Sequence, residues 1–393
     1  MSAITDAVVI DAVRSPMGTS ATGGPLRLVH PTDLLAQVLS GLVNRVGIDP
    51  TEIEAVITAC SAREAKHSPA IGRRVWHGAV TSQPLPATAI EVAGSSELAT
   101  RIAVQGLLAG TYQVVIAAGI QSMCSAGARP RWQGSDPRTA KQFSCNAREA
   151  NSAAIAAEAM AQRCGIAREE LDAFALRSFD RAAAVNRAGE FNREVTPVRL
   201  RGEGNTECGI SDEIATGEYL VRDHRSGEHR SFDARGGSDL QVNQAHAAPP
   251  ADCVAAVLIM SEQRARELCL TPRARFRSFA LVTAAPEFAC AGTTKASLVA
   301  MDRAGVMAAQ LDHVEVNEAL AVVPLAWQAA VGVHPEFLNP RGGAIALGDA
   351  GPAAGVRQLT TMLTALEDTG GRFGLSVNWK LGGAAAAVII ERP

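Results

Sequence analysis

The chain contains 393 residues, 47% of them hydrophobic and 20% charged, and its 37 lysines and arginines nearly balance 40 aspartates and glutamates. The resulting formal net charge of -3 excludes functions that depend on a strongly basic surface, such as binding nucleic acids or anionic lipids. The length predicts roughly two to three domains, and the 35 glycines with only 4% aromatic residues are typical of a closely packed α/β protein. Chemistry on a small molecule is therefore the expected class of function.

No pattern in the chain predicts export or insertion into a membrane. The opening residues lack a basic segment followed by a long apolar one, and no apolar stretch reaches the length of a membrane span. Eight cysteines without close paired spacing are typical of reduced cytoplasmic thiols, and the eight histidines show no metal-ligand spacing. We expect a cytoplasmic protein without a metal, a nucleic-acid partner or a membrane partner.

Short apolar runs alternate with longer helical patterns in the first part of the chain. This alternation is typical of a mainly parallel sheet covered by helices. Strands are expected at residues 7–10, 55–57, 88–92 and 114–118, and helices at 33–46 and 95–108. Gly110 is expected to end the second helix.

From residue 124 to about residue 250 the composition changes. Arg, Gly, Ser and Asp become frequent, apolar runs become rare, and helical patterns at 147–165 and 169–189 stand between loops. This change predicts an inserted loop domain at 124–250. The N-terminal half then consists of residues 1–123 and 251–273, and the C-terminal half of residues 274–393.

The α/β pattern resumes after the loop domain and then repeats. Strands are expected at 253–260, 274–282, 314–316, 373–377 and 384–390, and helices at 294–304 and 352–366. In each half an apolar segment leads into a glycine-containing turn that opens a long helix, after Val92 in the first and after Leu347 in the second. Duplication of one α/β unit explains this match and predicts two sheets stacked around shared helices.

The two matching turns place Ala93 and Asp349 near the N-termini of long helices. Free backbone N–H groups and the helix dipole stabilise developing negative charge there. We therefore expect the chemistry of the protein, if it has any, at these two turns.

Five motifs, in chain order, resemble those of the thiolase family over the whole chain. They are AVRSPMG at 12–18, AAGIQSM at 117–123, NEALA at 317–321, GGAIALG at 342–348 and GGA at 382–384. The resemblance implies a duplicated α/β fold in five layers, αβαβα, with an inserted loop domain. It also implies a homodimer or homotetramer that binds CoA or acyl-CoA as substrate or ligand, with no tightly bound cofactor.

Thiolases attack a 3-ketoacyl-CoA with a cysteine thiolate, activate it with a histidine and move a proton with a second cysteine. The resemblance carries these three roles onto Ala93, Asp349 and Trp379, or onto Lys380 in place of Trp379 if the last motif slips by one residue. Alanine has no nucleophile, and an ionised aspartate would repel a thiolate. Three coordinated replacements indicate natural divergence rather than one engineered change, and they predict the loss of cysteine-dependent thiolysis and Claisen condensation.

Asn317 is the one position of the family's catalytic set that is retained, in the Asn-Glu-Ala motif. The resemblance implies that its amide positions a water molecule in an oxyanion hole. A buried hydrogen bond that holds the loop is the structural alternative, and both interpretations stay open at this point.

The loop that contacts the pantetheine arm in the family also departs from the family pattern. Its serine falls on Ala248 and its glycine on Pro249, and a second proline follows. Proline fixes φ and removes a donor, so this wall of the coenzyme site is expected to differ in shape. His246 is a candidate general base, although a histidine in a surface loop is the more frequent outcome.

Five side chains, three of them named above, bear further on the chemistry. Ser95 is expected to cap the helix that follows, and Glu97 is a first-turn carboxylate that suits the helix dipole at a position that is usually apolar in the family. Trp379 is expected to pack in the core. Asp349 and Lys380 form either a new acid/base pair or a salt bridge, because the family brings these two loops together.

Three hypotheses follow from these observations. The first is a noncatalytic protein that binds CoA or an acyl-CoA, or a partner subunit that forms a hetero-oligomer with an active homologue. The second is an acyltransferase, or an enzyme that makes or breaks C–C bonds, with acid/base residues rebuilt from Asp349, Lys380, Asn317 and His246. The third is a thiolase that uses a displaced thiol.

Overall fold

The computed structural model describes residues 6–19, 26, 29–60, 71–76, 80, 90–93, 95–122, 157–199, 242, 244–284, 289–379 and 384–393. The strands are β1 (Ala7–Arg14), β2 (Gly18–Thr19), β3 (Ala55–Cys60), β4 (Ile90–Ala93), β5 (Val114–Gln121), β6 (Ala251–Ser261), β7 (Ala274–Thr283), β8 (His313–Val316), β9 (Phe373–Trp379) and β10 (Ala384–Glu391). The longer helices are α1 (Pro31–Val46), α4 (Ser96–Leu108), α7 (Arg168–Arg187), α10 (Ala289–Ala304), α11 (Val322–Val331) and α13 (Ala354–Thr369).

Short helices connect these elements. They are α3 (Ile71–Val75), α9 (Glu262–Glu267) and α12 (Ala344–Leu347), together with the single 3-10 turns η3 (Pro50–Glu52), η5 (Glu190–Arg193), η7 (Gln244–His246), η9 (Ala308–Gln310) and η10 (Gly351–Ala353). Residues 157–164 form one further helix. Every strand expected in the two halves is present, and most of them extend beyond the expected bounds. Four helices, α3, α9, α11 and α12, were not expected from the sequence.

The strands of the two halves follow the same plan. The first half has the order β4-β3-β5-β6-β1, in which β4, β3 and β5 are parallel and β6 is antiparallel to both β5 and β1. The second half has the order β8-β9-β10-β7, with β8 and β9 parallel and β10 antiparallel to both β9 and β7. Leu338 forms a parallel bridge with Val314 of β8 and so takes the position in the strand order that β4 has in the first half. The strand order therefore carries the duplication that the sequence predicts.

The two stacked sheets are joined at one edge by hydrogen-bonded strands. Strand β1 pairs antiparallel with β7 through Val8–Arg275 and Val9–Ala274, which connects all ten strands. Both β1 and β7 end the sheet of their own half, and pairing them satisfies polar edge groups that would otherwise be exposed.

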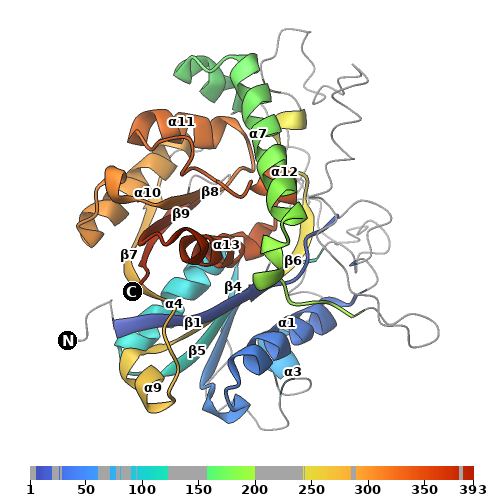
Figure 1. The fold of residues 1–393 in the computed structure, drawn as a ribbon, viewed down its shortest axis with the longest axis vertical. Coiled ribbons are helices and arrows are strands. Elements are labelled where there is room, and N and C mark those ends of the chain that lie inside the picture. The colour runs from blue at the N-terminus through green and yellow to red at the C-terminus, as the bar shows by residue number, and fades with distance from the viewer. Residues whose placement is uncertain are drawn as a thin grey trace, which may run out of the picture.

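The helices complete five layers around these strands (Figure 1). Helices α1 and α3 cover the outer face of the first half, α10 and α11 cover the outer face of the second half, and α4 and α13 lie between the two. Every residue of α13 from Ala354 to Leu366 is buried, because this helix packs against strands of both halves. These five layers, αβαβα, are the arrangement that the resemblance implies.

Small residues allow the central helices to lie close to the strands. A Cβ atom on Gly119 of β5 would stand 2.6 Å from the Cα atom of Ala353, just before α13. Of the predicted loop domain at 124–250, the structure describes residues 157–199, 242 and 244–250, where α7 packs against α12. The division into three domains remains a prediction.

Candidate functional site

Ala93 is the last residue of strand β4, and helix α4 begins three residues later at Ser96. Ala93 pairs with Cys60, the last residue of the neighbouring parallel strand β3. Ser95 has extended backbone angles (φ -154°, ψ 117°), and its hydroxyl accepts the N–H of Leu98 at 3.4 Å. The expected N-cap is confirmed, and Ala93 lies two residues before it.

The N-terminus of α13 lies against that of α4. No side chain of its own caps α13 at Ala353. The hydroxyl of Ser96, the first residue of α4, accepts the N–H of Val356 at 3.0 Å. The two central helices therefore begin at the same place in the molecule.

Asp349 lies in the turn that leads to α13, after Gly348, whose φ of 92° is one that glycine adopts without strain. The Asp349 side chain accepts the N–H of Gly351 at 3.1 Å. Its backbone N–H donates to Pro249 at 2.7 Å, and its carbonyl accepts the N–H of Ala251 at 3.0 Å. Proline has no backbone N–H to donate, but of the two prolines these hydrogen bonds use only the carbonyl of Pro249, so the prolines do not disrupt them.

The segment that contains His246, Ala248 and Pro249 also contacts the Asn-Glu-Ala motif. Ala248 donates its N–H to the carbonyl of Ala319 at 3.1 Å, and the carbonyl of His246 accepts the N–H of Ala321 at 2.7 Å. The structure therefore brings the candidate coenzyme-site residues between Asp349 on one side and the loop of Asn317 on the other.

His246 is fully buried, so the expectation of a surface histidine is wrong. Its Nε2 atom lies 2.6 Å from Oδ1 of Asp172 on α7. Helix α7 covers the loop and supplies this carboxylate from 74 positions away in the sequence, and no local pattern in the sequence connects the two residues.

Asn317 is buried, and both ends of its amide are hydrogen-bonded within the protein. Its Oδ1 atom accepts the N–H of Ala319 at 2.7 Å, and its Nδ2 atom donates to Oδ1 of Asn378 at 2.7 Å. Asn378 in turn donates to Gln358 on α13. Sequence reasoning identified Asn317 but missed the other two amides, because they come from separate elements. The oxyanion role stays a prediction.

Glu318, the next residue of the motif, holds the surrounding loops together. It accepts hydrogen bonds from Ser178 at 2.7 Å, from Asn339 at 2.6 Å and from the N–H of Ile345 at 3.2 Å. Burial raises the pKa of Glu318 above its usual value of 4.5, and these three hydrogen bonds act in the opposite direction. The motif marks Glu318 in the sequence, whereas no sequence signal marks Ser178 or Asn339.

Trp379 ends β9 and is buried beside α11, in a cluster with Trp327 and Leu320. The expected packing in the core is confirmed. Among the described residues its indole N–H has no hydrogen-bond partner. Lys380, the alternative second-cysteine position, lies outside the described residues.

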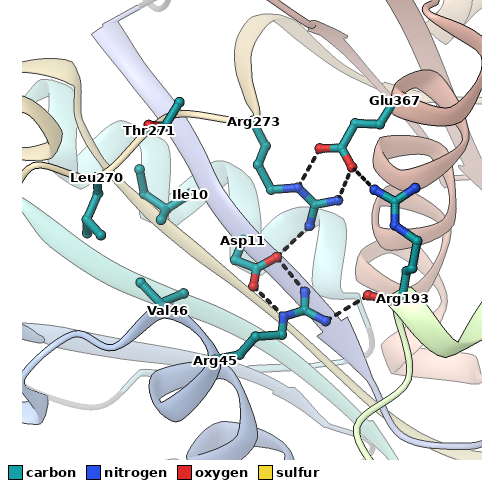
Figure 2. A pocket seen from close by; sticks show the side chains of 9 residues that line it. All are labelled: Ile10, Asp11, Arg45, Val46, Arg193, Leu270, Thr271, Arg273 and Glu367. Atoms are coloured by element: carbon teal, nitrogen blue, oxygen red, sulfur yellow. Dashed lines mark hydrogen bonds and ion pairs between the residues drawn. The ribbon is translucent and has the colours of Figure 1, made fainter.

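A cavity of about 420 Å³ lies far from these residues, beside the C-terminal end of α13 (Figure 2). Its Asp11 pairs with Arg45 and Arg273, and its Glu367 pairs with Arg273 and Arg193. Glu367 lies 13 residues beyond Ala354, which is about 20 Å along the helix. Paired charges line this cavity, and they connect α1, β1, η5 and α13.

The described part of the chain offers neither a metal site nor a membrane span. It contains no group of three His, Cys, Asp or Glu side chains placed to hold a metal ion. None of its helices is both long enough and apolar enough to cross a membrane.

Comparison with known families covers both halves. Residues 7–263 match the N-terminal domain of thiolase, and residues 270–392 match the C-terminal domain of thiolase. The chain belongs to the thiolase family. The two matched regions meet between β6 and β7, where the duplicated strand order also divides the molecule.

Individual thiolases are similar over almost their whole length. The steroid 3-ketoacyl-CoA thiolase FadA6 of Mycobacterium tuberculosis is 32% identical over 99% of this chain and 95% of its own. The acetyl-CoA acetyltransferase of Chromobacterium violaceum is 31% identical over 99% of this chain and 100% of its own. The crystal structure of human mitochondrial 3-ketoacyl-CoA thiolase superposes with a TM-score of 0.86 at 25% identity, and both chains are fully covered.

Proposed function

We propose that this thiolase-family protein binds CoA or an acyl-CoA thioester at the N-termini of α4 and α13 and does not carry out cysteine-dependent thiolysis or Claisen condensation. The observation that carries the proposal is the end of β4. Ala93 lies directly before the capped N-terminus of α4, at the position that the family resemblance gives to the nucleophile. A methyl group cannot form an acyl-enzyme.

The other two catalytic positions support the same proposal. Asp349, at the histidine position, accepts a backbone N–H within its own turn. Trp379, at the second-cysteine position, is packed in the core. Asn317 is retained, but both ends of its amide are hydrogen-bonded to the protein. Its amide can act in an oxyanion hole only if a bound water replaces one of these protein partners. These residues therefore support binding of a CoA thioester, which is one part of the family's activity. We expect the bound thioester to lie next to His246, Ala248 and Pro249.

The experiment that tests this proposal combines binding with an assay. Calorimetry with CoA, acetyl-CoA and acetoacetyl-CoA is expected to show binding, and acetoacetyl-CoA with free CoA is expected to give no acetyl-CoA. Failure of all three compounds to bind at millimolar concentration would contradict the binding, and turnover would contradict the loss of thiolysis.

A displaced thiol is the second candidate because Cys60 is buried at the end of β3 and pairs with Ala93. If thiolysis is found, Cys60→Ala tests this candidate directly. Loss of turnover in that variant with unchanged binding of CoA would identify Cys60 as the nucleophile, and retained turnover would exclude it.

We also propose that the protein is a cytoplasmic homodimer, or a partner subunit of an active homologue. Strand β4 ends the strand order and has one hydrogen-bonded neighbour, β3, among the described strands, which leaves an edge that a second chain can extend. Light scattering on the purified protein tests the homodimer. A monomer in solution that assembles only with an added active thiolase would favour the partner subunit.

A further inference from the structure

Glu97 is a buried carboxylate in the first turn of α4, with one oxygen that has no partner. The residue is 9% exposed. Its Oε2 atom accepts the hydroxyl of Ser95 at 2.6 Å. Within the described part of the chain, its Oε1 atom has no hydrogen-bond partner. A buried acceptor without a donor is destabilising, so this oxygen indicates a ligand or substrate group that supplies an O–H or N–H.

The carboxyl group lies between the N-termini of both central helices. Glu97 is the second residue of α4, and Gly355 is the second residue of α13. A Cβ atom at Gly355 would overlap the carboxyl carbon of Glu97, so the glycine makes the space that the carboxyl group occupies. The positive ends of two helix dipoles favour a negative charge at this point, and they would equally favour the oxyanion of a reacting thioester.

A hydrogen bond ties the carboxyl group to the turn that follows the nucleophile position. Its partner Ser95 is two residues beyond Ala93, and two residues of extended chain span at most about 7 Å.

We propose that Glu97 is the general base of a hydrolytic site for acyl-CoA thioesters, which rests on the binding proposed above. Oε1 accepts a proton from a water molecule while the water oxygen bonds to the thioester carbonyl carbon. The C–S bond then breaks, and the proton passes from Glu97 to the sulfur of CoA. Acyl-CoA and water thus give a carboxylic acid and CoA, with no oxidant or reductant.

The test measures thiol release and binding together, with acetyl-CoA, acetoacetyl-CoA and octanoyl-CoA as probes. The wild-type protein is expected to hydrolyse at least one of them. Glu97→Gln is expected to lower that rate at least about 100-fold, the usual contribution of a general base, while the Kd for CoA changes less than threefold. Glu170→Gln is the matched control, because Glu170 is an exposed first-turn carboxylate of α7, and its rate is expected to equal that of the wild type.

Two further measurements keep the outcome clear. Glu97→Leu, which restores an apolar residue, is expected to fold and bind CoA without hydrolysing the probe. For the wild type, hydrolysis is expected to be slower in D2O, since a proton moves in the rate-limiting step. Binding of all three probes without hydrolysis, or an unchanged rate in both Glu97 variants, would overturn the role of Glu97 and leave the binding proposal intact. Absence of any binding would overturn both.

Discussion

The N-terminal turns of α4 and α13 differ, although the two halves share one strand order. Helix α4 has its own cap in Ser95 and a carboxylate in Glu97. Helix α13 has no side-chain cap of its own, receives the hydroxyl of Ser96 from α4, and has Gly355 opposite Glu97. The two halves share a scaffold, while their helix ends are complementary to each other. At these two helix ends the first half supplies the polar side chains, and the second half supplies the space at Gly355.

Substitution of two glycines, one in each half, is expected to give the largest difference in the free energy of unfolding. A Cβ atom on Gly119 of β5 would meet backbone atoms at 2.6 and 2.7 Å, whereas one on Gly374 of β9 would meet the Met362 side chain at 2.6 Å. Backbone cannot yield as a flexible methionine does. We expect Gly119→Ala to lower the free energy of unfolding by about 3 kcal/mol, and Gly374→Ala by about 1 kcal/mol. Urea denaturation measures both, and equal costs would contradict the asymmetry.

Glu318 gives the next largest effect, as a dependence of stability on pH. Because its pKa is raised in the folded protein, the folded state holds this proton more tightly than the unfolded state. The stabilisation is complete below the usual pKa of 4.5 and is lost as pH rises through the higher folded pKa. Each pH unit that separates the folded pKa from the unfolded pKa corresponds to about 1.4 kcal/mol of stability.

Thermal unfolding between pH 4 and 8 checks this dependence. Glu318→Gln cannot titrate, so the stability difference between wild type and variant is expected to change steadily in favour of the variant above pH 4.5. Glu170→Gln, at an exposed position, is expected to give a difference that does not change in this way. Parallel curves for the wild type and Glu318→Gln would show that burial does not raise this pKa.

Ser96 gives the smallest effect and tests the capping across the two helices. Ser96→Ala removes the acceptor for the N–H of Val356 and is expected to cost about 1 kcal/mol. In hydrogen exchange, the Val356 amide in α13 is expected to exchange faster, although the substitution is in α4. Ser261→Ala is the control, because the Ser261 side chain caps the separate helix α9, and it should leave Val356 unchanged. Unchanged exchange in Ser96→Ala would contradict the coupling.

Most of the fold was predictable from the sequence because its strands are short, apolar and separated by helical patterns. Two of the four unexpected helices, α12 and α11, have a physical reason in their sequence. Residues 344–347 are as apolar as a buried strand, but a four-residue run does not distinguish a strand from a buried helical turn, and it forms α12. Helix α11 is apolar on nearly every side, so it has no polar face to mark its period.

The candidate site was predictable in position more than in contacts. The family motifs placed Ala93, Asp349 and Asn317 at the turns where the structure has them. The bonds of His246 to Asp172 and of Asn378 to Gln358 join elements that only tertiary packing brings together. The sequence also shows Glu97 as a first-turn residue, but its burial depends on Gly355, which lies in the other half.

Acylation by acetyl-CoA tests the central claim most directly, that this thiolase-family site has lost its nucleophile at Ala93. Wild-type protein and Ala93→Cys are incubated with acetyl-CoA, denatured and analysed by peptide mass spectrometry. The account predicts no acetylated cysteine in the wild type, and the variant shows whether a cysteine at position 93 restores acylation although Asp349 stands at the histidine position. An acetylated cysteine in the wild type would contradict the account.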